Sequence, residues 1–241
     1  MKKLTWFVTG IVLFLSGVVL QAQTADEILK DYFNAIGQDK TIKVKTVTTT
    51  GKITQGGMDL PFIMYNSRPL KLRMEFTIQG QKIIQAFDGT NGWMINPMAG
   101  SLAPQDMGPD QIKQLKQQAD MDGLLYNYKE KESTLEYSDK DEVDGTEVYK
   151  LKLTDKNGDI TYYYIDTDSN ILLKTTAKRT IQGNELEGNT LYSNYQMIDE
   201  MAVPFSIATV INGQTVAEIV VEKVDFDKEV PDSLFVKPAG N

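Results

Sequence analysis

The sequence predicts an α+β fold in which one long antiparallel sheet carries most of the chain and helices are few. Apolar and polar residues alternate along many short runs, which is the pattern of strands with one buried face. Successive runs follow each other at hairpin spacing, and no helical segment crosses over between parallel strands. Only two segments have a helical period instead.

The strand pattern is clearest where Leu72, Met74 and Phe76 alternate with Arg73 and Glu75. Met58, Leu60, Phe62 and Met64 repeat it one hairpin earlier. With these two runs, strands are expected near residues 42–54, 58–64, 70–78, 82–88, 92–96, 134–138, 147–154, 160–166, 170–181, 189–198, 203–211 and 215–226.

The first helix is expected to begin after Thr24. Thr24 and Glu27 have the spacing of a capping box, in which each side chain bonds the backbone of the other residue. One apolar stripe follows, and Gly37 is a typical helix end. The stripe contains Ile28, Leu29, Tyr32, Phe33 and Ile36.

The second helix is expected in the middle of the sheet. From residue 100 to about residue 123 the strand period disappears, and Pro109 is well placed to start a helix. Ile112, Leu115 and Ala119 would then share one face, while the opposite face is polar. Such a narrow apolar stripe must be covered, so we expect this helix to lie across the concave side of the curved sheet.

The N-terminal segment has the layout of a secretory signal peptide. Lys2 and Lys3 precede a charge-free apolar run at residues 4–20, and Ala22 is a suitable residue for cleavage. We therefore expect residues 1–22 to be removed and the rest of the protein to be exported across the membrane. An uncleaved membrane anchor is the alternative, because a spanning helix needs roughly 20 apolar residues.

Composition excludes several functional classes. Residues 1–22 hold two lysines and no acid, so their removal takes the net charge from −8 to −10. A protein this acidic lacks the basic surface that binds nucleic acid. The chain contains neither His nor Cys, which removes the usual general base, the thiolate nucleophile and the commonest zinc ligands. We expect no enzymatic activity, no metal and no cofactor.

Two acidic segments resemble calcium ligands at first sight. Residues 155–159 (DKNGD) and 166–170 (DTDSN) place oxygen atoms at alternate positions. Neither has the later Gly and Glu that a calcium loop requires. Both separate strand-like runs, so tight hairpin turns are the favoured interpretation.

The methionines are concentrated in one part of the chain. Seven of the nine that follow the initiator lie between residues 58 and 121. Flexible thioether side chains suit a surface that accepts varied apolar ligands. The alternative is that they replace leucine in an ordinary core.

Several short motifs resemble the periplasmic lipoprotein carriers LolA and LolB. Residues 67–74 (SRPLKLRM) lead into residues 87–97 (FDGTNGWMINP), which is similar to the Arg-Pro, Asp-Gly, Trp and Pro core of those carriers. Residues 203–207 (VPFSI) and 230–235 (VPDSLF) are similar to motifs of the wider set of lipoprotein-sorting proteins. The resemblance spans most of residues 23–241 and implies one domain.

This resemblance implies a half-open β-barrel whose concave apolar face is covered by helices that act as a lid. The family binds the acyl chains of lipoproteins there and carries them to the outer membrane. The expected ligand is an acylated lipoprotein or lipid. An inner-membrane transporter would release it to the carrier, and an outer-membrane acceptor would receive it from the carrier. The residues expected to form the cavity or lid are Leu72, Met74, Phe76, Trp93, Met94, Ile95, Met98, Ile112 and Leu115.

Arg68 is the expected lid-holding residue. In these carriers an arginine at a strand end, next to proline, bonds the backbone of the lid helix, and Arg68 before Pro69 matches that position. The alternative is a surface arginine in a turn.

A second hypothesis is a non-enzymatic periplasmic sensor or interaction module on the same scaffold; in either role we expect a monomer. Residues 124–200 have no evident counterpart in the carriers. The tyrosines at 162–164 within them are interpreted as cross-strand pairs rather than ligand contacts.

Overall fold

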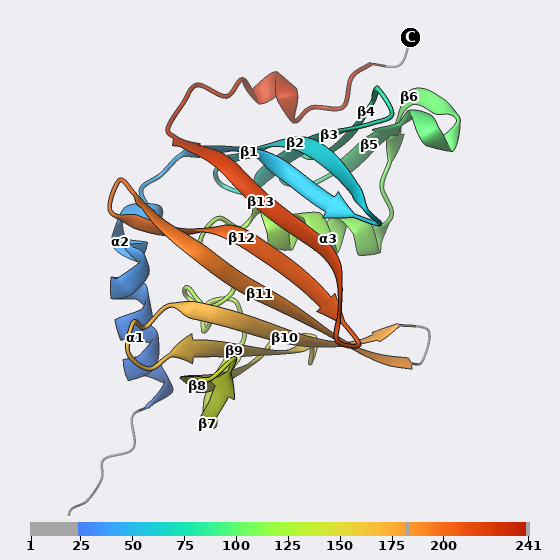
Figure 1. Ribbon diagram of the computed structural model, residues 1–241. Coiled ribbons are helices and arrows are strands. Elements are labelled where there is room, and N and C mark those ends of the chain that lie inside the picture. The colour runs from blue at the N-terminus through green and yellow to red at the C-terminus, as the bar shows by residue number, and fades with distance from the viewer. Residues whose placement is uncertain (1–23, 182–183, 240–241) are drawn as a thin grey trace, which may run out of the picture.

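One curved antiparallel sheet forms the body of the protein in the computed structural model, which describes residues 24–181 and 184–239. Its 13 strands lie in the order β6-β5-β4-β3-β2-β1-β13-β12-β11-β10-β9-β8-β7. Figure 1 shows the sheet curling from β1–β6 through β13–β11 to β10–β7, with helix α3 on its inner side. The end strands β6 and β7 do not pair within the described chain, which confirms the predicted α+β half-open barrel.

The strands match the predicted runs with one addition, β6, and two extensions: β7 continues past residue 138 to Val143, and β11 begins before residue 189, at Asn184. Their bounds are β1 Thr46–Gln55, β2 Met58–Ser67, β3 Lys71–Ile78, β4 Gln81–Phe87, β5 Gly92–Asn96, β6 Ser101–Asp106, β7 Thr134–Val143, β8 Thr146–Thr154, β9 Ile160–Asp166, β10 Leu172–Ile181, β11 Asn184–Ile198, β12 Met201–Ile211 and β13 Gln214–Phe226.

One pair of neighbouring strands joins distant parts of the chain. β1 pairs with β13 as well as with β2, whereas every other pair of neighbours is consecutive in sequence. Two meanders therefore leave this central seam, and they end at β6 on one edge and at β7 on the other. The connection between β6 and β7 must cross from edge to edge, and it carries α3 (Pro109–Ala119).

Helix α1 (Ala25–Ile36) has the predicted ends. The Thr24 hydroxyl accepts a hydrogen bond from the Glu27 N–H at 3.2 Å, and the Glu27 carboxylate accepts one from the Thr24 N–H at 2.8 Å. Gly37 has a φ of 70°, which ends the helix in the left-handed region. A short helix, α2 (Gln38–Thr41), follows at once and was not predicted.

A bulge contributes to the curvature of the sheet at the central seam. The register between β1 and β13 shifts between Thr50 and Gly51. A Cβ atom on Gly51 would lie 2.2 Å from the carbonyl oxygen of Val220, so only glycine fits where the two backbones approach.

Each long helix covers its own part of the core. The predicted buried stripes are confirmed by Ile28 and Leu29 on α1 and by Leu115 and Ala119 on α3. The α1 cluster also contains Leu125, Leu151, Leu153, Tyr163, Ile165 and Leu172. The α3 cluster also contains Leu72, Phe87 and Met107. A third cluster joins β12 and β13 through Phe205, Val221 and Val224.

Both acidic segments form the predicted hairpin turns. The Asp155 carboxylate accepts hydrogen bonds from the N–H groups of Asn157 at 2.8 Å and Asp159 at 2.9 Å. The Asp166 carboxylate accepts one from the Asp168 N–H at 2.9 Å. The oxygen atoms of these two aspartates are thus used to close the turns.

The segment after β5 differs from the expectation. Strand β6 was missed because Gly100 and Pro104 interrupt the alternation, but an edge strand tolerates proline. A 3₁₀ turn (Pro97–Ala99) precedes β6, and another (Asp232–Leu234) lies near the C-terminus. The predicted signal peptide, residues 1–22, lies outside the described residues. Within the described ranges, no helix is long and apolar enough to cross a membrane.

Candidate ligand cavity

A cavity of about 590 Å³ lies on the inner side of the curved sheet. Tyr32, Phe33 and Ile36 of α1 form one wall, and residues 117–125, which include the end of α3, form another. The sheet contributes residues of β1, β2 and β9–β13, and Gln38, Thr41 and Val44 complete the lining. The apolar part of the lining includes Val44, Val47, Met64, Leu124, Leu125, Leu172, Met201, Ala202, Val203 and Phe226.

Three neighbouring strands supply hydroxyl groups to the cavity. Tyr163 of β9 lies opposite Thr175 of β10, which in turn lies opposite Thr190 of β11. Residues directly opposite each other in antiparallel strands share one face of the sheet, and all three line the cavity. The strand alternation therefore places a row of hydroxyl groups on the inner face of β9–β11.

The phenols around this row stay protonated near neutral pH. Burial raises the pKa of Tyr163, and the nearby phenols of Tyr192 and Tyr32 raise it further. Burial likewise raises the pKa of Tyr32, with an additional effect of Tyr192. Tyr192 shares a hydrogen bond of 3.4 Å with the hydroxyl of Thr175.

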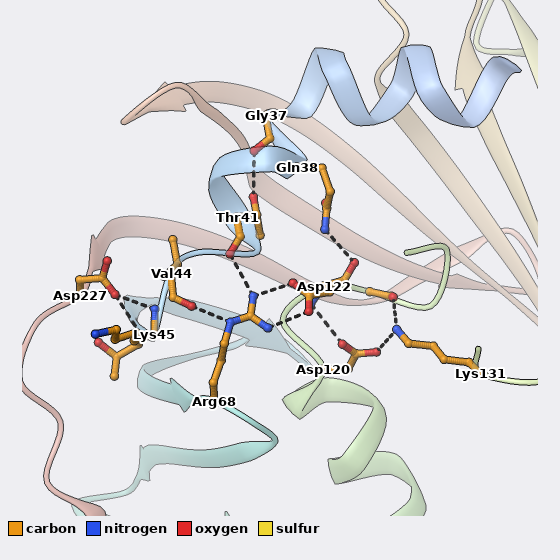
Figure 2. Close-up of polar contacts among 12 residues, drawn as sticks. Gly37, Gln38, Thr41, Val44, Lys45, Arg68, Asp120, Asp122, Lys131 and Asp227 are labelled. Carbon is orange, nitrogen blue, oxygen red and sulfur yellow. Dashed lines mark hydrogen bonds and ion pairs between the residues drawn. The ribbon is translucent and has the colours of Figure 1, made fainter. Parts of the chain in front are cut away.

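Arg68 fixes the segment that follows α3. Figure 2 shows its guanidinium between the end of α2 and Asp122. Two of its nitrogen atoms donate to the Asp122 carboxylate, at 2.7 and 2.6 Å. It also donates to the carbonyl oxygens of Val44 at 2.6 Å and Thr41 at 3.0 Å. The hydrogen bond to Asp122 raises the pKa of Arg68, against the opposing effect of burial.

Further polar side chains hold the same segment. Lys131 donates to the Asp120 carboxylate at 2.6 Å and to the Gly123 carbonyl at 2.7 Å (Figure 2). Asn66 donates to the carbonyl of Gln118 on α3 at 3.3 Å. Residues 118–123, which we call the latch segment, are therefore fixed by contacts with several parts of the chain.

The geometry refines the lid-holding prediction for Arg68. Its side chain is only 25% exposed, so the surface alternative does not describe it. It bonds a carboxylate of the latch segment and the backbone of α2, while Asn66 makes the bond to the backbone of α3. The part of Arg68 in ligand transfer stays a prediction.

The structure brings four of the nine predicted cavity residues together beneath α3. Leu72 and Leu115 are buried there, and Met94 and Ile112 pack against them. Met74 and Phe76 lie on the same face of β3, opposite Met64 and Phe62. None of these six belongs to the lining of the cavity described above, so their contact with a ligand stays a prediction.

The other three predicted residues do not join this group. Trp93 and Ile95 pair with Ala86 and Ile84 and so face the outer side of the sheet, because successive residues of a strand point to opposite faces. Their placement beside Met94 in one cavity was wrong. Met98 is 53% exposed in the turn after β5.

The outer face at Trp93 is covered by the C-terminal segment. The Trp93 indole N–H donates to the carbonyl of Phe235 at 2.8 Å, and the Arg73 guanidinium lies 5.5 Å from the indole ring. Phe235 is fully buried there. Trp93, which was predicted to contact the ligand, therefore contacts the C-terminal segment instead.

Sequence reasoning missed the side chains of β9–β11 that line the cavity. Tyr163 faces inward. Tyr162 and Tyr164 face outward, and the Lys150 ammonium lies 5.3 Å from the centre of each of their rings. The consecutive tyrosines therefore put bulk on both faces, and only the middle one reaches the cavity. Alternation separates these faces, but it cannot tell which face is concave.

The sequence matches no protein-family model and no curated protein. Several solved structures, however, share the fold. A DUF1329 family protein from Desulfovibrio piger has a TM-score of 0.62 at 13% identity, covering 87% of this chain and 97% of that one. A LolA superfamily protein from Nitrosomonas europaea has a TM-score of 0.60 at 14% identity, with coverages of 89% and 98%.

An outer membrane lipoprotein-sorting protein domain from Vibrio parahaemolyticus is similar in the same way. Its TM-score is 0.57 at 12% identity, and 86% of this chain and 97% of that chain are covered. At these identities the comparisons establish the shared fold and leave the function to be argued from the cavity.

Proposed function

We propose that this protein is a periplasmic carrier that binds an acyl chain of a lipid or lipoprotein in the cavity and moves it toward the outer membrane. The observation that carries the proposal is the cavity itself, a space of about 590 Å³ between the inner face of the sheet and the latch segment. Cavities that hold small molecules span roughly 300–1,000 Å³.

The lining suits a hydrocarbon chain. Phe33, Ile36, Val47, Met64 and Phe226 contribute apolar surface from three separate parts of the chain. Each methylene withdrawn from water contributes about 0.8 kcal/mol, so a long chain needs such shelter to cross an aqueous compartment. The role requires no catalytic group, metal or cofactor.

The latch segment supports a carrier because it forms part of the wall. Apart from Ala119, which is buried in the α3 cluster, the latch segment is held by hydrogen bonds and ion pairs, whereas α1 and the body of α3 are held by apolar cores. A segment fixed in this way opens at a lower free-energy cost than a packed helix. We propose that it moves when ligand enters or leaves.

The resemblance in fold to a LolA superfamily protein and to a lipoprotein-sorting domain also supports the proposal. Under it, residues 1–22 are a cleaved signal peptide and residues 23–241 form one monomeric domain. The further partners would be an inner-membrane transporter that releases the cargo and an outer-membrane acceptor.

Lipid analysis of the purified protein tests the proposal. Ala177 lines the cavity, whereas Ala208 lies opposite Leu191 on the outer face of the neighbouring sheet region. We expect mass spectrometry to find acyl lipid with the wild type and with Ala208→Phe. Ala177→Phe, which fills the cavity, should lower the bound lipid about tenfold.

Two results would contradict this expectation. One is a wild type without acyl lipid, and the other is an Ala177→Phe variant that carries as much lipid as Ala208→Phe. A protein partner in stable complex with lipid-free wild type would support the interaction-module hypothesis instead.

A further inference from the structure

We propose that the cavity selects an uncharged lipid, such as an acyl ester, whose neutral oxygen atoms accept hydrogen bonds from the hydroxyls of Tyr163 and Tyr32. The inference rests on the proposed acyl-binding function and adds the chemistry of the group attached to the chain. It follows from two independent features, the unpaired phenols and the charge of the lining.

The Tyr163 hydroxyl is a donor without a protein acceptor. The side chain is 8% exposed, and no hydrogen bond joins its hydroxyl to any residue in the ranges 24–181 and 184–239. Within those ranges every fully buried side-chain polar atom has a partner. The unpaired hydroxyl must therefore reach open space, and Tyr163 lines the cavity.

Tyr32 presents a second unpaired phenol from the opposite wall. It projects from α1, lines the cavity and forms no side-chain hydrogen bond with the described part of the chain. Tyr163 belongs to the core cluster beneath α1, and Tyr32 packs against that cluster, so the two side chains border the same part of the cavity. A buried hydroxyl is stabilised by a hydrogen-bond partner, so this pair favours a ligand with acceptor atoms.

The charge of the lining disfavours an anion. Among the described residues that line the cavity, none is lysine or arginine, and two are aspartates. Asp122 is bound by Arg68 and Asp120 by Lys131, so both carboxylates are already paired with cations outside the lining. A carboxylate or phosphate in the cavity would lose hydration without gaining a counter-charge.

An ester both supplies acceptor atoms and carries no negative charge. Its carbonyl oxygen is an uncharged acceptor, and the phenols, which remain protonated because burial raises the pKa of each, are donors. The attached chain would lie along the apolar lining near Phe33 and Phe226. A free fatty acid has the same chain, but its carboxyl group is ionised at pH values above its pKa.

Calorimetric titration of the delipidated protein tests the selection at about pH 8. The probes are monolauroylglycerol and laurate, which share one acyl chain. We expect the glyceride to bind at least about tenfold more tightly than laurate. Tyr163→Phe should weaken glyceride binding by about 3–10-fold, the effect of one hydrogen bond, and leave laurate binding unchanged.

Tyr195→Phe is the matched control. The Tyr195 hydroxyl already donates to the carbonyl of Leu172 at 2.7 Å and is not part of the lining, so its loss should leave the affinity for both probes unchanged. Laurate binding as tight as glyceride binding would overturn the selection and leave acyl binding intact. An unchanged glyceride affinity in Tyr163→Phe would overturn it too. Failure of both probes to bind would remove the proposed function as well.

Discussion

At the scale of single residues, Arg68 connects the latch segment with residues 41–44, which lie far from it in sequence. Its guanidinium bonds Asp122, the end of α2 and the backbone at Val44. The planar fork of arginine matches a carboxylate in two parallel hydrogen bonds, which a lysine cannot reproduce. The contacts explain how a single side chain fixes one edge of the latch segment.

Replacing Arg68 by leucine should lower the free energy of unfolding by about 2–3 kcal/mol, because Asp122, at 18% exposure, loses its only ion-pair partner in the described chain. Urea unfolding measures this. The double variant Arg68→Leu, Asp122→Leu should recover part of the loss through the coupling of the two residues. Lys52 is the control, because its 3.9 Å contact with Glu222 is exposed to solvent. Lys52→Leu should change the free energy of unfolding by less than about 1 kcal/mol. Equal losses in Arg68→Leu and Lys52→Leu would contradict the assignment.

At the scale of elements, α3 lies where it does because it connects the two open edges of the sheet. The helix rests on β5 at Gly92, where a side chain would meet the helix directly. A Cβ atom there would lie 3.2 Å from Ile112 and 3.4 Å from Leu115. Glycine at this position allows the close approach between helix and strand.

Gly92→Ala should therefore push α3 away from the sheet and cost about 1–3 kcal/mol, the usual effect of overpacking. Urea unfolding measures the loss, and hydrogen exchange should be faster in residues 109–119. Gly188→Ala is the matched control, because the space around a Cβ at Gly188 is open. Similar effects of the two substitutions would show that α3 does not depend on this contact.

At the scale of the whole molecule, the curved sheet is covered on its inner face and, at β3–β5, also on its outer face. α1 and α3 pack on the inner face, and the segment after β13 packs on the outer face (Figure 1). Lys71 pairs with Asp232 at 2.8 Å, and Arg73 donates to the carbonyl of Leu234 at 2.7 Å. These contacts place Phe235 over Trp93, so this part of the outer face of β3–β5 is buried rather than a free surface.

Phe235→Ala should detach this segment and lower the free energy of unfolding by about 3–5 kcal/mol. Because Trp6 lies in the predicted signal peptide, Trp93 is the single tryptophan of the processed chain, and its fluorescence reports the change. We expect the emission to shift to the red as water reaches the indole. Val236→Ala, at an exposed neighbour, should cause no shift. A red shift of equal size in both variants would refute the role of Phe235.

The sequence by itself determined most of the elements of this protein, although it did not predict β6 or α2. The capping box at Thr24, the stripe of Leu115 and the alternation of Leu72, Met74 and Phe76 are local patterns, because a helix or strand repeats its burial every few residues. Hairpin spacing likewise predicted that consecutive strands pair in antiparallel fashion. Together these features were sufficient to predict a curved antiparallel sheet with two long helices.

Only the tertiary structure decided which faces enclose the cavity. Period-two alternation assigns Trp93 and Met94 to opposite faces, but curvature determines which face is concave, and it arises from strand twist and from bulges such as that at Gly51. The meeting of Tyr32, Tyr163 and the latch segment depends on the pairing of β1 with β13. This strand pairing joins residues near the two ends of the described chain, so no local sequence pattern can predict it.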